Sequence, residues 1–247
     1  MDFGIKGKVA LVTGTGSQIG MGKAIALTLA REGCSIISAD LDVAGAKKTA
    51  DEVKATGQKA IALEVNVSNQ AQVNEMVKAA LAEFGKVDIL ANTAGGTASA
   101  GPLHQASEEK WQRDININFL GSMYCAKAVL PGMMQQKYGK IVNFSSGVAI
   151  NGMPGSSSYA GAKAAVIAFT KCLALEAGPM GINVNCLAPT MVMTNFGTHG
   201  TMDPKQAEAM ASRMTLRRLT TTQDVANAVL FLVSEMSSGI TGQVLSF

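Results

Sequence analysis

Residues 12–26 read VTGTGSQIGMGKAIA and place four glycines between an apolar run and a stretch of helical character. A glycine pattern alone is weak evidence, because most such patterns are turns. Here the pattern follows the apolar run 9–13 and precedes a second apolar run that ends in Asp40. Glycines let a backbone turn sharply and approach a pyrophosphate, and the N–H groups at a helix start donate to it. The context therefore favours a dinucleotide-binding loop.

Short apolar runs alternate with amphipathic stretches along the whole chain, as a parallel sheet covered on both faces requires. We predict strands at 9–13, 35–39, 60–65, 87–92, 140–146 and 182–189, and helices at 22–31, 44–56, 107–134, 158–177 and 223–233, with one more helix behind Ser68 as its N-cap. The prediction is an α/β fold: one domain over residues 1–247, a doubly wound parallel sheet (Rossmann fold) with helices on both faces. The irregular segment 191–222 is predicted to cover the substrate.

Composition and charge narrow the classes of partner. The 247 residues carry 21 Lys and Arg against 18 Asp and Glu, without a basic run longer than a pair, which does not favour nucleic acid. Neither a signal peptide nor an apolar run long enough to cross a bilayer is evident, so we predict a cytoplasmic protein that does not bind membranes. We expect no metal site, because His104 and His199 lack partners at ligand spacing. The cysteines are interpreted as small buried thiols: Cys34, Cys125, Cys172 and Cys186.

The acidic residue at the end of the second predicted strand indicates which dinucleotide binds. A carboxylate there accepts hydrogen bonds from the adenosine ribose hydroxyls and repels a 2′-phosphate. No Arg or Lys directly follows Ser17 or adjoins Asp40, and Lys23 is interpreted as a solvated helical residue. The sequence therefore predicts NAD, with NADP as the less favoured alternative.

Several further motifs occur in order behind the glycine loop. They are ANTAG (91–95), NINFLG (116–121), IVNFSS (141–146), YAGAK (159–163) and INVNCLAPTMVMT (182–194). Together with the glycine loop they resemble the ordered motifs of the short-chain dehydrogenase/reductase family. The resemblance extends over essentially the whole chain.

Tyr159 and Lys163 are four residues apart at a helix start, so their side chains share one face. The ordinary tyrosine pKa of about 10 is too high for a base at neutral pH, and a nearby ammonium favours the phenolate. The pair therefore predicts a general acid/base. The resemblance implies that Ser146 polarises the substrate carbonyl and that Lys163 also binds the nicotinamide ribose. Ser145, one residue away on the same strand, is the competing candidate.

The family resemblance also implies the remaining site residues. Asn118 corresponds to an asparagine that holds a proton-relay water, with Asn116 as the off-register alternative. The implied cofactor contacts, beyond Asp40, Tyr159 and Lys163, are Gly14, Ser17, Ile19, Gly20, Met21, Leu41, Asn66, Val67, Asn92, Ala94, Gly95, Pro189, Val192 and Thr194.

The chain departs from the family pattern at several positions. The glycine loop is two residues longer than usual if its glycines are Gly14, Gly20 and Gly22, whereas the alternative register puts Gln18 where a glycine is usual. Thr190 replaces a glycine near the nicotinamide, and Asn66 replaces an aspartate. None of these changes removes a predicted catalytic residue.

We expect an NAD-dependent dehydrogenase of a secondary alcohol, or the reverse ketone reductase. A largely apolar substrate is inferred from the irregular segment, which contains Met191, Met193, Phe196, Met202, Met210 and Met214. The alternatives are a reductase of 3-oxoacyl thioesters on a carrier protein or coenzyme A, and a non-catalytic NAD sensor or scaffold. The resemblance implies a homotetramer built on helices 107–134 and 158–177, where small residues allow close packing: Ala162, Ala165 and Ala168.

Overall fold

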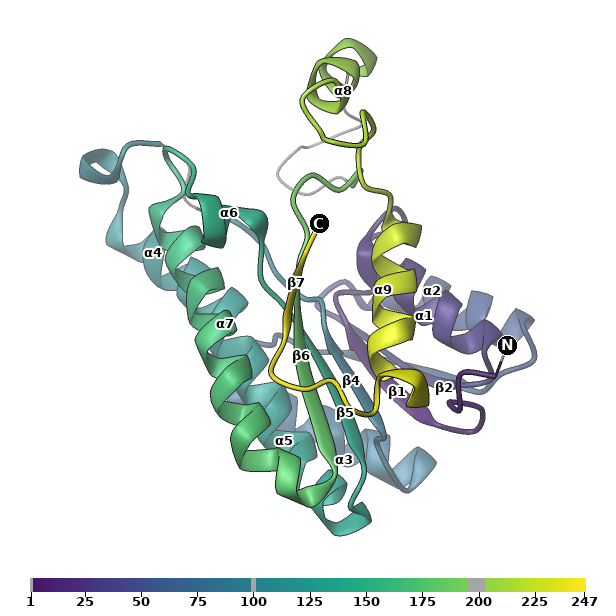
Figure 1. Ribbon diagram of the computed structural model, residues 1–247. Helices are drawn as coiled ribbons and strands as arrows, with labels where there is room; N and C mark the ends of the chain where they lie inside the picture. The colour runs from purple at the N-terminus through teal and green to yellow at the C-terminus, as the bar shows by residue number, and fades with distance from the viewer. Residues whose placement is uncertain (1, 99–100, 195–202) are drawn as a thin grey trace.

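The computed structural model describes residues 2–98, 101–194 and 203–247. Its centre is a sheet of seven parallel strands in the order β3-β2-β1-β4-β5-β6-β7 (Figure 1). The strands are β1 (Val9–Thr13), β2 (Ser35–Asp40), β3 (Ala60–Glu64), β4 (Ile89–Asn92), β5 (Gly139–Phe144), β6 (Ile182–Ala188) and β7 (Val244–Ser246). The order reverses between β1 and β4, and ligands bind at such a switch point beside the carboxyl ends of the strands.

Helices cover both faces of the sheet. α1 (Met21–Arg31), α2 (Val43–Ala55) and α9 (Thr222–Val233) pack on one face, and α3 (Gln70–Phe84), α5 (Gly121–Gln136) and α7 (Ser157–Ala177) pack on the other (Figure 1). Each face buries its own apolar core, which is why the central strands contain continuous apolar runs. The predicted doubly wound α/β fold is confirmed. Two short helices complete it: α6 (Gly147–Asn151) and α8 (Pro204–Ala211).

The helix predicted over residues 107–134 is interrupted. It consists of α4 (Glu108–Ile115), a π-helical turn (Asn116–Leu120) and α5. A π turn inserts an extra residue into a helix and is frequent at functional sites. The turn contains Asn118, so it lies where the sequence predicts part of the active site.

The structure differs from the sequence-based expectations at three further points. The N-cap of α3 is Asn69 rather than Ser68, because the Asn69 side chain accepts from the N–H groups of Ala71 and Gln72. Cys172 is exposed on α7, not buried, since its position faces away from the sheet. The seventh strand, β7, was not predicted, because it has only three residues and two of them are exposed. No helix among the described residues is long and apolar enough to span a membrane.

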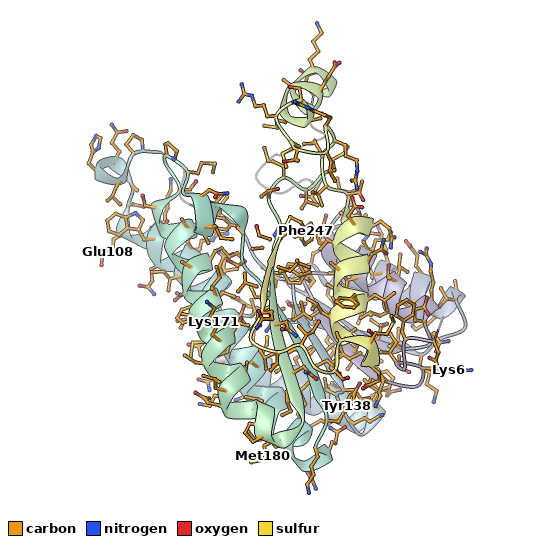
Figure 2. The ribbon with its side chains drawn as sticks, in the orientation of Figure 1. Lys6, Glu108, Tyr138, Lys171, Met180 and Phe247 are labelled. Carbon is orange, nitrogen blue, oxygen red and sulfur yellow. The ribbon has the colours of Figure 1, made fainter. Side chains whose placement is uncertain are left out.

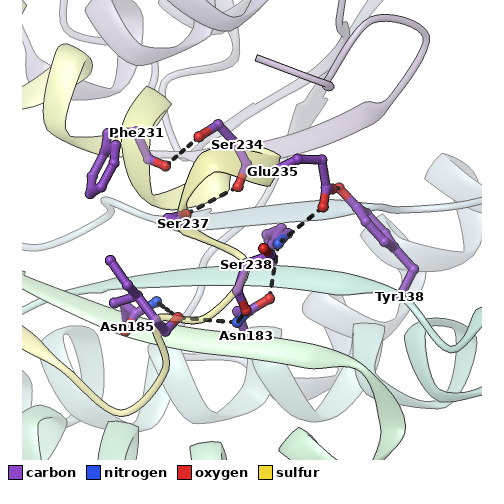
Figure 3. Close-up of polar contacts among 10 residues, drawn as sticks. Tyr138, Asn183, Asn185, Phe231, Ser234, Glu235, Ser237 and Ser238 are labelled. Atoms are coloured by element: carbon purple, nitrogen blue, oxygen red, sulfur yellow. Dashed lines mark hydrogen bonds and ion pairs between the residues drawn. The ribbon is translucent and has the colours of Figure 1, made fainter. Parts of the chain in front are cut away.

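Two asparagines of β6, Asn183 and the buried Asn185, bind the C-terminal segment to this strand through side-chain hydrogen bonds (Figure 3). Asn185 donates to the carbonyl of Ile240 (2.9 Å) and accepts from the N–H of Gln243 (3.1 Å). Asn183 donates to the carbonyl of Ser238 (2.8 Å). These bonds set the register in which β7 joins the sheet.

We predict that Asn185→Ala lowers the free energy of unfolding by about 2 kcal/mol, because it removes two hydrogen bonds made by a buried side chain. Denaturant unfolding followed by circular dichroism measures the change. Asn74→Ala, at an exposed position of α3, is the control and should change stability by less than about 0.5 kcal/mol. Equal stability of the two variants would contradict the role of Asn185.

Candidate active site

A cavity of about 320 Å³ opens at the carboxyl ends of β4, β5 and β6. It brings together predicted residues from five parts of the chain: Met21, Gly95, Ser146, Tyr159, Lys163, Pro189, Val192 and Thr194. Figure 2 shows that Phe247 lies toward this edge of the sheet, whereas Tyr138 lies at the opposite edge. The predicted catalytic residues Ser146, Tyr159 and Lys163 therefore meet the predicted nicotinamide-binding positions in one space.

Three predicted catalytic side chains face this cavity. Tyr159, in the first turn of α7, is only 9% exposed, and its hydroxyl is hydrogen-bonded to Ser146. Lys163 lies one turn further along α7, with its Nζ 5.8 Å from the centre of the Tyr159 ring. That Nζ donates to the carbonyl oxygen of Phe144 at 2.8 Å. The arrangement provides a hydroxyl pair beside a buried amine.

Burial is the largest cause of the pKa shifts of both groups. It raises the pKa of Tyr159 above its ordinary value, an effect opposed by the hydrogen bond from Ser146 and reinforced by the charge of Asp114. It lowers the pKa of Lys163 to about 8. The expectation that Lys163 lowers the pKa of Tyr159 is therefore wrong for the protein alone, because the dry surroundings favour the neutral form of each group.

The two adjacent serines have different partners. Ser146 caps α6 and accepts from the N–H of Val148 at 3.3 Å, while also bonding to Tyr159. The Ser145 hydroxyl donates to the carbonyl of Lys163 at 2.7 Å. Geometry thus favours Ser146 as the serine that contacts substrate, and Ser145 as a residue that holds α7 in place.

The glycine loop has the shape of a cradle for a dinucleotide phosphate. A Cβ at Gly22 would overlap the carbonyl of Gly14, and a Cβ at Gly14 would lie 2.8 Å from the backbone nitrogen of Ala94. Gly20 is the N-cap of α1 and has no side chain with which to cap the N–H groups of that helix. Uncapped N–H groups and the helix dipole favour an anion. The geometry fits the register Gly14, Gly20 and Gly22.

The carboxylate of Asp40 lies beside this loop at the end of β2. It accepts from the N–H of Gly16 (2.7 Å) and from that of Asp42 (2.9 Å). Gln18 donates to the carbonyls of Gly16 (2.9 Å) and Gly45 (3.1 Å), which ties the longer loop to α2. Asp40 is thus held in one orientation at the entrance to the crevice.

Lys23 is not merely solvated, as the sequence suggested. Its Nζ donates to Gln18 Oε1 at 2.9 Å and pairs with Glu52 at 2.6 Å. The cation is therefore held by an acid on α2, which reduces its availability to a 2′-phosphate.

The other predicted cofactor residues differ in their surroundings. Ile19 and Leu41 are exposed beside the loop. Ser17 accepts from the N–H of Gly20 through its carbonyl. Asn66 accepts from Ser68 and so stabilises the turn after β3, while Val67 packs against the backbone at Gly121.

Asn92 is the exception among the predicted cofactor residues. Its side chain is 3% exposed and donates to Asn143 Oδ1 at 2.8 Å and to the carbonyl of Ser122 at 3.3 Å. The side chain of Asn92 therefore points into the fold, because successive strand residues point to opposite faces, and its predicted contact with the cofactor stays a prediction for its backbone groups.

Asn118 lies behind the cavity wall rather than in it. Its amide donates to the carbonyls of Gly96 (2.7 Å) and Asp114 (2.9 Å), and its Oδ1 accepts from the N–H of Gly96 (3.2 Å). The side chain thus holds the loop after β4, and its relay of a proton stays a prediction. Asn116 accepts from Gln112 at the surface, away from the cavity.

Sequence reasoning missed the cavity residues between Ser146 and Tyr159. Val148 of α6 and Met153 both line the cavity. The signal was available, since both ends of this short connection are predicted catalytic residues and its chain must stay close to the site. Met191 and Met210 also line the cavity, Met193 is exposed and Met214 lines a separate groove. His199, Phe196 and Met202 lie outside the described residues.

Comparisons with known proteins agree with this geometry. The family model described as enoyl-(acyl carrier protein) reductase matches residues 14–247. This chain belongs to the short-chain dehydrogenase/reductase family, as the motifs predicted, and is an oxidoreductase whose fold serves a nicotinamide cofactor.

Individual relatives match over almost their full length. The chain is 38% identical to the (2S)-[(R)-hydroxy(phenyl)methyl]succinyl-CoA dehydrogenase subunit BbsD of Thauera aromatica, over 98% of this chain and 96% of the relative. It is 37% identical to the 3-oxoacyl-[acyl-carrier-protein] reductase FabG of Thermotoga maritima, with the same coverage. The structure of an NAD⁺-bound xylitol dehydrogenase superimposes with a TM-score of 0.88 at 31% identity, over 98% of both chains.

The buried Lys163 predicts a pH dependence of stability. Its pKa of about 8 in the folded protein lies below the ordinary lysine value of 10.5, so the unfolded chain binds more protons between those values. Stability contributed by this residue therefore rises with pH across that window. We expect the free energy of unfolding of the wild type to rise relative to that of Lys163→Met, by up to about 3 kcal/mol.

Denaturant unfolding of both proteins at several pH values between 8 and 10.5 measures this difference. Lys171→Met, at an exposed position of the same helix, is the control and should keep a constant difference from the wild type. A constant difference for Lys163→Met as well would contradict the burial argument.

Proposed function

We propose that the protein is an NAD-dependent dehydrogenase that interconverts a secondary alcohol and a ketone. The observation that carries this proposal is the hydrogen bond between Tyr159 and Ser146 beside buried Lys163, at a cavity adjoining the glycine loop. All the groups that the chemistry requires on the protein side line one space. A non-catalytic sensor would have no need of this arrangement.

The proposed mechanism assigns one task to each side chain. When bound, an oxidised nicotinamide supplies the hydride acceptor and a positive charge that favours the phenolate of Tyr159. Ser146 donates a hydrogen bond to the substrate oxygen. Tyr159 accepts the alcohol proton in oxidation and returns it in reduction. Lys163 orients the cofactor ribose, and the walls from α6 and residues 189–194 exclude water from the reacting carbon.

The preference for NAD follows from two features. Asp40 is fixed by the N–H groups of Gly16 and Asp42 where it would accept from the ribose hydroxyls. Lys23, which directly follows the glycine loop in the sequence, is paired with Glu52. A 2′-phosphate would meet a carboxylate without a free counter-charge from Lys23.

A 3-oxoacyl or related acyl thioester is the second candidate substrate. The names of two relatives, a succinyl-CoA dehydrogenase subunit and an acyl-carrier-protein reductase, favour it. The apolar walls of the cavity, including Met153, Met191 and Met210, suit an acyl chain as well as a free ketone. Turnover of a 3-hydroxyacyl thioester in preference to free alcohols would favour this candidate.

We also propose a homotetramer, with contacts through the outer faces of α5 and α7. Leu175 on α7 is 81% exposed, and Phe119 and Phe169 form an edge-to-face pair that is only half-buried. Exposed apolar side chains of this size are typical of a surface that another chain covers. Of the small residues predicted to permit close packing, Ala162 is buried within the chain, whereas Ala168 is exposed.

Tyr159→Phe is expected to lower the turnover of the alcohol identified in a substrate screen by about 10²–10⁴-fold, because the proton acceptor is removed. NADH affinity, measured by fluorescence titration, should remain within about threefold, as the loop that holds the phosphates is untouched. Tyr124→Phe, on α5, is the matched control and should retain turnover. Full activity of Tyr159→Phe would overturn the proposed mechanism.

Asp40→Asn is expected to lower the ratio of the NADPH to the NADH dissociation constant by about tenfold, because a negative charge facing the 2′-phosphate is removed. The two titrations should be performed at low and at high salt, since screening weakens the repulsion. Asp51→Asn, at an exposed position of α2, is the control and should leave the ratio of the two dissociation constants unchanged. A wild type that prefers NADPH would refute the interpretation of Asp40.

A further inference from the structure

A buried carboxylate that the mechanism above does not use lies behind the catalytic wall. Asp114, near the end of α4, is 1% exposed. Carboxylates are almost never fully buried unless several hydrogen bonds hold them. Its position therefore requires an explanation beyond the packing of α4.

The contacts of Asp114 join three segments that form the site. Oδ1 accepts from the N–H of Ala98 at 2.6 Å, in the loop after β4 that also carries Gly95 and Thr97 into the cavity wall. Oδ2 accepts from the hydroxyl of Ser158 at 2.7 Å, and Ser158 directly precedes Tyr159. Its main-chain carbonyl accepts from Asn118 at 2.9 Å.

The titratable group of α7 that is sensitive to the charge of Asp114, among the described residues, is Tyr159, which is buried. The loop after β4 contributes Thr97 and the π turn contributes Asn118, and neither of these side chains is ionisable. Arg113, on α4 itself, is exposed to solvent, where its charge is screened.

We propose that Asp114 is a positioning residue. It fixes the first turn of α7 against the loop after β4 and holds its own negative charge near Tyr159. This inference rests on the proposed function, in which Tyr159 transfers the proton. A buried negative charge disfavours the phenolate, because little water screens the repulsion. The charge of Asp114 raises the pKa of Tyr159 in the same direction as burial does. The protein is thereby biased toward the protonated phenol, which is the form that donates during ketone reduction.

A matched pair of variants separates the charge from the hydrogen bonds. Asp114→Asn removes the charge and keeps the size, while Asn can still accept from Ala98 and donate to Ser158. Ser158→Ala removes one hydrogen bond and keeps the charge. The first readout is the pH titration of tyrosine phenolate absorbance in the free full-length protein, with the matching Tyr159→Phe protein subtracted to isolate Tyr159 from Tyr124 and Tyr138.

We expect the Tyr159 phenolate to form at lower pH in Asp114→Asn than in the wild type, and at an unchanged pH in Ser158→Ala. The acidic limb of alcohol oxidation should move to lower pH in the same variant. Coincident titrations for Asp114→Asn and the wild type, or equal shifts in both variants, would overturn the proposal. If Asp114→Asn fails to fold, Asp114→Ser removes the charge and leaves room for a water.

The absorbance titration also separates this inference from the proposed function. It needs neither substrate nor cofactor, so it reports on Asp114 whatever the substrate is. Retained turnover in Tyr159→Phe would refute the proposed mechanism and leave the titration result standing. Loss of turnover in Tyr159→Phe together with an unshifted Asp114→Asn titration would refute only the role of Asp114.

Discussion

The contact between the backbones of Gly14, Gly22 and Ala94 is the constraint on which the site depends. No side chain fits between the turn after β1, the start of α1 and the loop after β4. This contact brings the N–H groups at the start of α1 to the point where the strand order reverses. It also fixes the loop after β4, whose continuation through Gly95 forms one wall of the cavity. The phosphate cradle and the reaction chamber thus share one structural element.

The exclusion of water from the buried side chains is the second property that determines how the site works. The surroundings that exclude water from the reacting groups also raise the pKa of Tyr159 and lower the pKa of Lys163. The protein alone therefore does not hold the ion pair that the Tyr-Lys spacing suggested. The charge needed for proton transfer must come partly from what binds in the crevice, so binding and activation of Tyr159 are coupled.

The sequence was a good guide wherever a feature depends on periodicity or on glycine. The buried strands, the helices on both faces and the glycine register all follow from local patterns. It was a poor guide to features that depend on contacts distant in sequence. Asn92 points inward only because of its place in the alternation of strand residues, and a shift of one residue would reverse its direction. The hydrogen bonds of Asn118 depend on Gly96, which lies 22 residues away. Asp114 has no local signal at all, because a charged residue on a helix is ordinarily solvated.

Several of these distant contacts converge on the π turn at Asn116–Leu120. Successive residues of an α-helix are separated by about 100° of rotation. The extra residue in this turn therefore sets the phase between α4, which carries Asp114, and α5, which packs on the sheet. Deleting one residue here would rotate the whole of α4 relative to α5 and turn Asp114 away from α7. The length of this segment is thus under a tighter constraint than the identity of most of its residues, and a homologue one residue shorter would need a different support for its catalytic wall.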